Sequence, residues 1–353
     1  MVRALASVIG KSNLAVFVRN DRPAELCGQG WDDYSISTSA WLPKALWSTG
    51  FASLLVQRAL RERPDLIITT HLNFTPFARF VRQVAKIPYW VALHGYESWE
   101  IKRPSQQRAV READLLLPVS IFTRDRVRRN YGVPAERMHV LHDTFDPARF
   151  SIGPKPTRLL ERFKLSSNDR IILTVGRLLA AEAYKGHDRL IRALPAIRGR
   201  VANAKYLIVG SGDDRPRLEA IARECGVTDA VIFAGRVPTE ELSGYYRLCD
   251  LFAMPSTGEG FGIVFLEALA TGKPVLAGNR DGSVDALNHG ELGVLVDPDD
   301  EGSIVEAATA LLLQTHPHPL VNQPEQLRAR VVELFGAERF MQAVAQLLDE
   351  KAT

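Results

Sequence analysis

Short apolar runs recur along this chain and alternate with longer stretches that have the spacing of helices. Such alternation is typical of βαβ units, in which crossover helices join parallel strands. Several runs are apolar throughout, as expected for strands that are covered on both faces. The sequence therefore predicts an α/β protein built on parallel sheets. The expected strands are residues 14–18, 65–69, 89–93, 115–119, 139–141, 171–175, 206–209, 231–233, 251–254 and 275–277, and the expected helices include 188–197, 215–225, 240–248 and 263–270.

Two series of these units are separated by the stretch DTFDPARFSIGPKP at residues 143–156, which is rich in proline and glycine. A chain of 353 residues is also too long for one ordinary α/β core. We therefore expect two Rossmann-like domains that face a central cleft, residues 1–150 and 151–334. After a second proline-rich stretch, residues 335–353 are expected to form a helix that crosses back to the first domain.

The apolar runs and the cysteines of the sequence indicate neither a membrane span nor a metal site. No apolar run approaches the roughly 18 residues that a membrane-spanning helix needs. The three cysteines, Cys27, Cys225 and Cys249, are scattered and show no metal-ligand spacing. We therefore expect a cytoplasmic protein with neither a metal site nor a nucleic-acid partner.

Charge is distributed unevenly along the chain. Residues 1–150 hold 21 Lys and Arg against 14 Asp and Glu, whereas the rest holds 23 against 27. The basic half suggests that one domain contacts something anionic, and uneven solvated charge is the alternative. Peripheral contact with the inner face of a membrane is one such expectation. It rests on Arg124, Arg126, Arg128 and Arg129, and on Trp41, Trp47 and Phe51 in a segment that would also suit a core helix.

The segment STGEGFGIVFLEALATGK at residues 256–273 follows an expected strand, and its three glycines crowd the turn before an expected helix. A helix that begins near Gly262 would direct its free N–H groups at this loop, which is a ready anion site. Glu259 in the loop and Glu267 in the helix bracket that site. This suits a ligand with phosphates in the middle and hydroxyls at both ends. An ordinary strand–turn–helix with surface glutamates is the alternative.

Two basic residues follow another expected strand. Arg177 comes directly after residues 171–175, and Lys185 lies in the sequence YKGHD. In open α/β sheets, ligands gather at the carboxyl ends of the strands. Arg177 and Lys185 could therefore neutralise a diphosphate from one side while the Glu259 loop holds it from the other. Each cation alone is more often solvated.

Taken in order, these segments resemble the family-4 retaining glycosyltransferases, which have the GT-B fold. The resemblance rests on the paired glutamates of Glu259-Gly-Phe-Gly and Glu267. It also rests on Gly176-Arg177, Lys185 and the segments VGSGDDRPRL, FAGRVP and GELGVLVDPDD, which stand in the order that the family shows. It extends from about residue 65 to about residue 340.

The resemblance implies that the first domain holds the acceptor and the second binds the nucleotide-sugar. Arg177 and Lys185 would bind the donor diphosphate, Glu267 the ribose hydroxyls and Glu259 the transferred sugar. His94, at the end of the strand 89–93, would be a catalytic-site histidine, although without the resemblance it suits a structural role. The implied catalytic residues are His94, Arg177, Lys185 and Glu259; the implied donor-binding residues are Gly176, Arg177, Lys185, Gly235, Arg236, Val237, Glu259, Gly260, Phe261, Gly262, Ile263 and Glu267.

The implied activity is metal-independent, retaining transfer of a hexose from a nucleotide-diphosphate sugar to a glycan or lipid-linked acceptor, as in the synthesis of cell-surface polysaccharide. No cofactor is expected besides the donor. A nicotinamide dehydrogenase is disfavoured, because Gly210-Ser-Gly212 is followed by two aspartates that would repel a pyrophosphate. A sugar-nucleotide epimerase of the same fold would need further acid–base carboxylates, for which Glu97 is the one candidate in the first half. A non-catalytic glycosyltransferase-like subunit is the third possibility.

Two departures from the family pattern carry expectations of their own. Family members open with a strand and a glycine-rich loop, whereas residues 2–10 here have the pattern of the first helix. We therefore expect the first domain to lack its N-terminal strand, leaving a slot beside residues 14–18 and 89–93. Either the natural protein is longer there, or this domain is less stable and poorly active. In addition, Asp281 and Asp285 occupy a loop where the family often has a glutamate.

Overall fold

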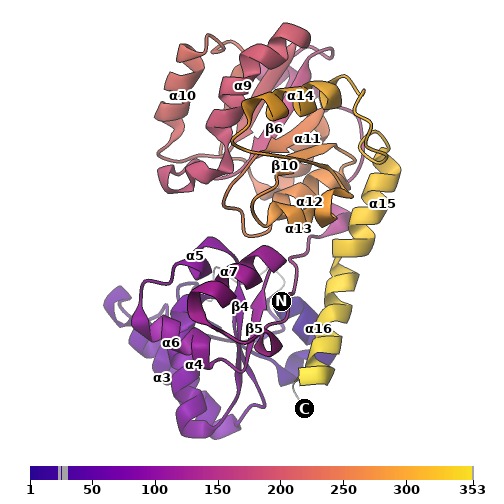
Figure 1. Ribbon diagram of the computed structural model, residues 1–353. Coiled ribbons are helices and arrows are strands. Elements are labelled where there is room, and N and C mark those ends of the chain that lie inside the picture. Colours follow the sequence, from indigo (N-terminus) through magenta and orange to yellow (C-terminus); the bar gives the residue numbers. More distant parts are fainter. Residues whose placement is uncertain (23–24, 26–30, 352–353) are drawn as a thin grey trace. The chain divides into compact units, whose positions relative to one another are not determined.

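The computed structural model describes residues 1–22, 25 and 31–351, so Cys27 lies outside the described part (Figure 1). The described residues form two compact units. The first contains those of Met1–Val119, Thr123–Leu141 and Glu338–Thr353; the second contains Ser120–Phe122 and His142–Ala337. The limit expected after residue 150 thus falls inside the second unit.

The first unit contains five described strands, all in parallel pairs. They form two sheets, with the orders β1-β2 and β3-β4-β5. The strands are β1 (Ala15–Val18), β2 (Ser35–Thr38), β3 (Ile67–Thr69), β4 (Tyr89–Leu93) and β5 (Leu115–Pro118); the helices are α1 (Val2–Ile9), α3 (Trp47–Glu62), α4 (Thr75–Ala85), α5 (Tyr96–Trp99), α6 (Pro104–Glu112), most of α7 (Ile121–Tyr131), and α16 (Ala337–Lys351).

Helices cover both faces of the three-stranded sheet. Neighbouring residues of a strand point to opposite faces, and β3 shows this clearly. Ile68 packs with Trp90, Leu5 of α1 and Leu347 of α16, whereas Ile67 packs in a cluster formed by α3 and α4. The apolar face of α16 therefore completes the core of the first unit.

Strand β1 has one strand neighbour, β2, among the described residues. Phe17 of β1 packs in the same cluster as Ile67 of β3, so the two sheets share a covering layer, although no strand of one pairs with a strand of the other in the described part of the chain. The expected helix before β1 is present as α1. The expectation of an open slot beside residues 89–93 is wrong, because β4 pairs on both edges, with β3 and β5.

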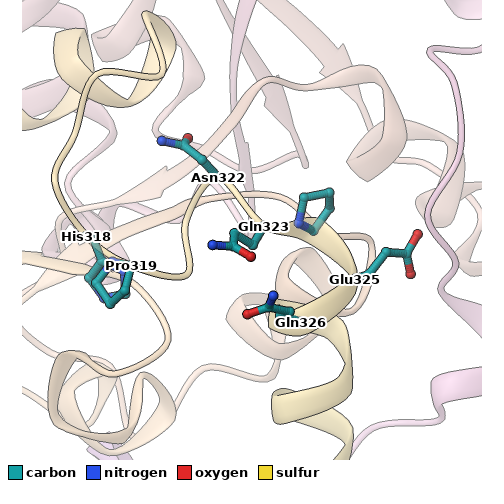
Figure 2. A pocket seen from close by; sticks show the side chains of 7 residues that line it. His318, Pro319, Asn322, Gln323, Glu325 and Gln326 are labelled. Carbon is teal, nitrogen blue, oxygen red and sulfur yellow. The ribbon is translucent and has the colours of Figure 1, made fainter.

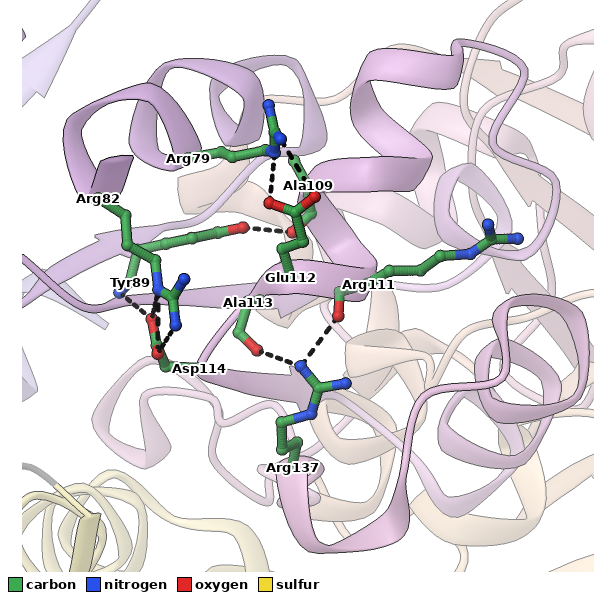
Figure 3. Close-up of polar contacts among 9 residues, drawn as sticks. All are labelled: Arg79, Arg82, Tyr89, Ala109, Arg111, Glu112, Ala113, Asp114 and Arg137. Carbon is green, nitrogen blue, oxygen red and sulfur yellow. Dashed lines mark hydrogen bonds and ion pairs between the residues drawn. The ribbon is translucent and has the colours of Figure 1, made fainter. Parts of the chain in front are cut away.

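Arginine pairs and backbone contacts join the helices of the first unit to the ends of its strands (Figure 3). Arg79 of α4 binds Glu112 of α6, and Arg82 binds the Asp114 carboxylate, which also accepts a hydrogen bond from the Tyr89 N–H. Arg137 donates to the backbone carbonyls of residues 111 and 113. Several arginines of this half therefore have structural partners.

The second unit is built on one six-stranded parallel sheet with the order β11-β10-β9-β6-β7-β8. The strands are β6 (Arg170–Val175), β7 (Ala204–Val209), β8 (Val231–Gly235), β9 (Leu251–Met254), β10 (Val275–Gly278) and β11 (Val294–Val296); the helices are α8 (Thr157–Phe163), α9 (His187–Arg200), α10 (Arg215–Glu224), α11 (Leu242–Leu248), α12 (Ile263–Ala270), α13 (Ser283–Ala286), α14 (Glu301–Leu312) and α15 (Pro324–Phe335).

Strand β9 is buried along its whole length, which explains its apolar sequence. Leu251 and Ala253 pack in the core formed with α9, α10 and α14. Phe252, on the other face, contacts the rings of Tyr246 in α11 and Phe265 in α12 at centroid distances of 5.7 and 5.8 Å. Helices therefore cover this sheet on both faces, as the sequence predicts.

The described strands differ from those expected in three places: one expected strand is missing and two others were not expected. Residues 139–141 form no named strand, and the nearby Met138 makes only an isolated bridge to Leu116. Strands β2 and β11 were not expected; β2 is mostly polar and β11 has three residues, so neither has a long apolar run. None of the described helices is long and apolar enough to span a lipid bilayer.

Candidate donor-binding site

The loops that follow β6 and β9 lie side by side, because the two strands are neighbours in the sheet. The first loop contains Arg177 and the 3-10 helix η6 (Ala180–Lys185), and the second contains Glu259. A backbone hydrogen bond joins them, from the Thr257 N–H to the carbonyl of Tyr184, at 2.9 Å. This adjacency places the expected cations and the expected glutamate at one edge of the sheet.

Charged side chains from the two loops meet there. Lys185 Nζ binds Glu259 Oε2 at 2.9 Å, and the Arg177 guanidinium binds the Glu182 carboxylate. Glu182 Oε2 also lies 3.9 Å from Lys185 Nζ. The side chains of Lys185 and Glu182 are each 11% exposed, whereas that of Arg177 is 72% exposed. Arg177 can therefore turn towards a ligand more readily than Lys185.

The N-terminus of α12 faces the same loop. Gly262 is the residue before the helix and has a φ of +96°, a conformation that favours glycine. An added Cβ there would lie 2.5 Å from the Phe265 ring. No side chain of the described residues caps the helix; the Phe265 N–H donates to the Gly262 carbonyl at 3.0 Å, which leaves the N–H groups of Ile263 and Val264 for an anion.

A buried aspartate holds the Glu259 loop in place. Asp281, which is 1% exposed, accepts hydrogen bonds from the Glu259 N–H (2.7 Å), the Ser256 hydroxyl (2.7 Å) and the Ser283 N–H (2.9 Å). Burial raises the pKa of Asp281, and these hydrogen bonds oppose the rise. Asp281 is one of the residues expected to depart from the family pattern, and it has a structural role here, because it joins the β9 and β10 loops.

Glu267 lies one turn into α12, where the phenol of Tyr246 donates a 2.6 Å hydrogen bond to its Oε2. Burial raises the pKa of the Glu267 carboxyl, and the hydrogen bond from Tyr246 opposes this. A half-buried carboxylate held by one donor retains acceptor capacity for hydroxyl groups, which is the property that a ribose contact needs.

The other predicted donor contacts are placed as follows. Gly235 ends β8 with a φ of +73°, and Arg236 and Val237 follow it at the carboxyl edge of the same sheet. The Phe261 ring is 1% exposed and stacks on His142, with centroids 5.2 Å apart. Because Phe261 is buried, its ring belongs to the packing beneath the loop and offers no open face to a ligand.

His94 belongs to the first unit and follows β4 directly. Its side chain is exposed, its Nε2 lies 3.1 Å from the carbonyl of Thr70, and its N–H donates to Glu97. His71, also considered from its strand-end position, has a structural partner: its Nδ1 accepts from the Asn73 N–H at the start of a 3-10 turn.

Sequence reasoning did not identify Glu182 or Tyr246. Nothing in AAEAYKG distinguishes Glu182 from an ordinary solvated carboxylate, and Tyr246 lies in an apolar helix face, far in sequence from Glu267. Only the folded arrangement brings them to the site. A hollow of about 570 Å³ elsewhere in this unit, lined by residues between His318 and Gln326, contains none of the predicted site residues (Figure 2).

Each unit is an α/β structure with parallel strands, and the second has cations and glycine-rich loops at the carboxyl ends of its strands. These features define the GT-B class of nucleotide-binding folds. The structure of HepE from Anabaena in complex with UDP matches with a TM-score of 0.80 and 21% identity, over 99% of this chain and 95% of that chain. Sucrose-phosphate synthase from Thermosynechococcus elongatus matches with a TM-score of 0.78 and 21% identity, over 99% and 92%.

Sequence comparison then identifies the family. The model "Glycosyltransferase Family 4" matches residues 11–149, and "Glycosyl transferases group 1" matches residues 157–330. A D-inositol 3-phosphate glycosyltransferase of Xylanimonas cellulosilytica is 33% identical over an alignment of 325 residues, and the match covers 83% of this chain and 70% of the relative. The chain therefore belongs to glycosyltransferase family 4.

Another relative is the GDP-mannose-dependent alpha-(1-6)-phosphatidylinositol monomannoside mannosyltransferase of Mycobacterium tuberculosis. It is 36% identical over 232 residues, and the match covers 62% of this chain and 59% of the relative. The chain thus spans about three fifths of the length of that mannosyltransferase.

Proposed function

We propose that this chain is a hexosyltransferase that moves a sugar from a nucleotide-diphosphate donor to a glycan or lipid-linked acceptor. The observation that carries the proposal is the convergence of Arg177, Lys185 and Glu259 at the carboxyl ends of β6 and β9, beside the open N-terminus of α12. The named activities of the relatives and the UDP bound by the HepE structure support the same donor chemistry.

Each part of this site has a distinct task in the proposed reaction. As the bond between sugar and diphosphate breaks, negative charge grows on the diphosphate. Arg177 can bind phosphate oxygens in a bidentate manner, and Lys185 supplies a compact charge. With the N–H groups at the start of α12, they stabilise the departing diphosphate and would make a divalent metal unnecessary. Glu267 is assigned to the ribose, and Glu259 to the transferred sugar.

The proposed stereochemical course is retention. Glu259, the carboxylate assigned to the sugar, is paired with Lys185, so it is not a ready nucleophile. A front-face route, in which the departing diphosphate helps to deprotonate the acceptor, needs no protein nucleophile. His94 is proposed to contact the donor sugar from the first domain. Inversion at the anomeric carbon, seen by NMR of the product, would contradict this course.

The test is release of nucleoside diphosphate from purified protein incubated with a panel of nucleotide-sugars, including GDP-mannose and UDP-glucose. A thermal-shift screen with the same panel identifies the donor first, because a ligand that binds only the native state raises its melting temperature. We expect turnover with at least one donor, unchanged by a chelator. Binding without turnover for every donor and acceptor would instead favour a non-catalytic subunit.

We also propose peripheral contact between the first unit and an anionic membrane surface. The support is local: Trp41 is 70% exposed and Leu46 is 49% exposed, with Lys44 between them. Phe51, by contrast, is buried in α3 and belongs to the core. Arg128 and Arg129 are exposed, whereas Arg126 lies 4.8 Å from the centroid of the Trp99 ring.

Flotation with vesicles that contain anionic lipid tests this contact. We expect binding at low salt that falls several-fold when Trp41 and Leu46 are both replaced by Ala. The matched control is Leu313→Ala, which removes an exposed apolar side chain from the second unit. Absence of binding by the unaltered protein, or equal binding by the double variant, would overturn the proposal.

A further inference from the structure

Glu182 occupies an unusual position for an acidic residue. It lies on η6 between the two cations assigned to the donor diphosphate, and it contacts both of them. One carboxylate oxygen binds Arg177. The other, Oε2, is buried, has no hydrogen-bond partner among the described residues, and lies 3.9 Å from Lys185 Nζ. A buried carboxylate oxygen without a donor is poorly satisfied, so this arrangement is not explained by stability alone.

The charges of the cluster balance before any ligand arrives. Arg177 and Lys185 supply two positive charges, and Glu182 and Glu259 supply two negative charges. A diphosphate that approaches these cations therefore meets a neutral cluster rather than a positive one. It must also replace a carboxylate at Arg177, whose side chain is exposed enough to turn.

We propose that Glu182 competes with the donor diphosphate for Arg177 and Lys185, and so sets how tightly this site holds a nucleoside diphosphate. The inference rests on the proposed function, because it takes the diphosphate as the ligand of these cations. A free nucleoside diphosphate carries one more negative charge than the same nucleotide joined to a sugar. Glu182 therefore repels the product more than the donor, which favours product release.

Replacing Glu182 with Gln keeps the shape of the side chain and removes its charge. We expect Glu182→Gln to bind inorganic pyrophosphate, UDP and GDP about tenfold more tightly than the unaltered protein, measured by calorimetry at low salt. The increase should be smaller for the intact nucleotide-sugar. It should also shrink at high salt, because screening weakens the interaction of charges.

Two further variants separate charge from other effects. Glu182→Ala also lacks the charge but cannot donate a hydrogen bond to phosphate, so tighter binding in both variants assigns the effect to the lost carboxylate. Glu306→Gln is the matched control, because Glu306 pairs with Arg200 on the surface of the same unit, and its loss should leave nucleotide binding unchanged. Thermal melting of each variant confirms that it is folded.

The outcomes distinguish this inference from the proposed function. If the unaltered protein binds nucleotide, and Glu182→Gln and Glu182→Ala bind it equally or more weakly, Glu182 is a supporting residue and the inference is wrong while the proposed function stands. If neither the unaltered protein nor any variant binds pyrophosphate or a nucleotide, the diphosphate site itself is wrong, and both proposals fall with it.

Discussion

Arg177 and Lys185 are the residues whose removal should matter most. We expect the double variant Arg177→Ala/Lys185→Ala to lose a factor of roughly 10² to 10⁴ in turnover, because charge developing on the diphosphate loses both cations. The measurement is the rate of nucleoside diphosphate release at saturating donor. The control Arg198→Ala/Lys205→Ala removes the same two residue types, both half-buried, from their pairing with the exposed Asp229 in the same unit. Comparable losses of turnover in both double variants would show that Arg177 and Lys185 have no special role in the reaction.

The Glu267 carboxylate should lower the stability of the fold while it strengthens the binding of nucleotide. Burial raises its pKa, so the protonated carboxyl is favoured in the folded state, and its contribution to stability is lost as pH rises from the unfolded value through the folded one. Glu267→Gln should therefore be more stable than the unaltered protein at pH 8, by on the order of 1 kcal/mol, and similar to it near pH 4. Its affinity for nucleotide should fall about tenfold. Urea unfolding at both pH values and nucleotide titration measure the two effects; a variant that is less stable at pH 8 would contradict the prediction.

His187 should make the protein sensitive to acid. Its side chain is 3% exposed, and burial lowers the pKa of the imidazole from 6.5 to about 4. Because the folded-state pKa is the lower one, stability falls as pH drops from about 6.5 towards 4, by roughly 3 kcal/mol in total. In His187→Gln the loss between pH 7 and pH 4.5 should be smaller by roughly 2 kcal/mol. Urea unfolding at the two pH values tests this, and equal losses in both proteins would refute it.

Among individual residues, those that occupy fixed positions after strands could be predicted from the sequence. Arg177, Lys185 and Glu259 lie at one edge of the sheet, because parallel order brings the ends of β6 and β9 together there. Partners such as Glu182 and Tyr246 could not be predicted, because their contacts depend on side-chain directions in the folded loops and helices.

The backbones of the β9 and β10 loops are in close contact, and this contact depends on Gly282. Its N–H donates to the Glu259 carbonyl at 2.9 Å, and a Cβ added there would overlap the backbone of Gly260. Gly282→Ala should therefore displace the Glu259 loop, lowering stability by about 1–3 kcal/mol and activity by about tenfold or more.

Gly199 in α9 provides the matched control, because an added Cβ there meets nothing within 4 Å. In a helix, Gly→Ala should raise stability by about 0.5–1 kcal/mol. Thermal melts and activity assays of the two variants should thus change in opposite directions. A Gly282→Ala protein with normal stability and activity would show that the loops are not tightly coupled.

Elements with long apolar runs were predictable, and short or polar ones were not. All five strands expected in the second half are present, because their buried faces require apolar residues. The polar strand β2 (SIST) is determined by its pairing with β1, which is a tertiary property. The same reason applies to the separation of β1 and β2 from β3, which no local pattern records.

In the whole molecule, the first unit depends on a helix from the other end of the sequence. Leu347 of α16 is 2% exposed and packs in the cluster that contains Trp90. Leu347→Ala should lower the stability of this unit by about 2–5 kcal/mol. All five tryptophans of the chain lie in the first unit, so tryptophan fluorescence during urea unfolding reports on it alone. Leu313→Ala, exposed in the second unit, should leave that transition within about 0.5 kcal/mol of its original position, and an equal shift in both variants would contradict the prediction.

The placement of α16 also fixes an order of events during synthesis. A ribosome makes residues 142–337 before it makes Val344 and Leu347, so the second unit can reach its folded state while the first still lacks part of its core. Until then Leu5 and Trp90 are left without these partners in the nascent chain. The domain that is begun first is therefore the one completed last, and its early exposure makes it the part of the protein that most needs protection from aggregation before translation ends.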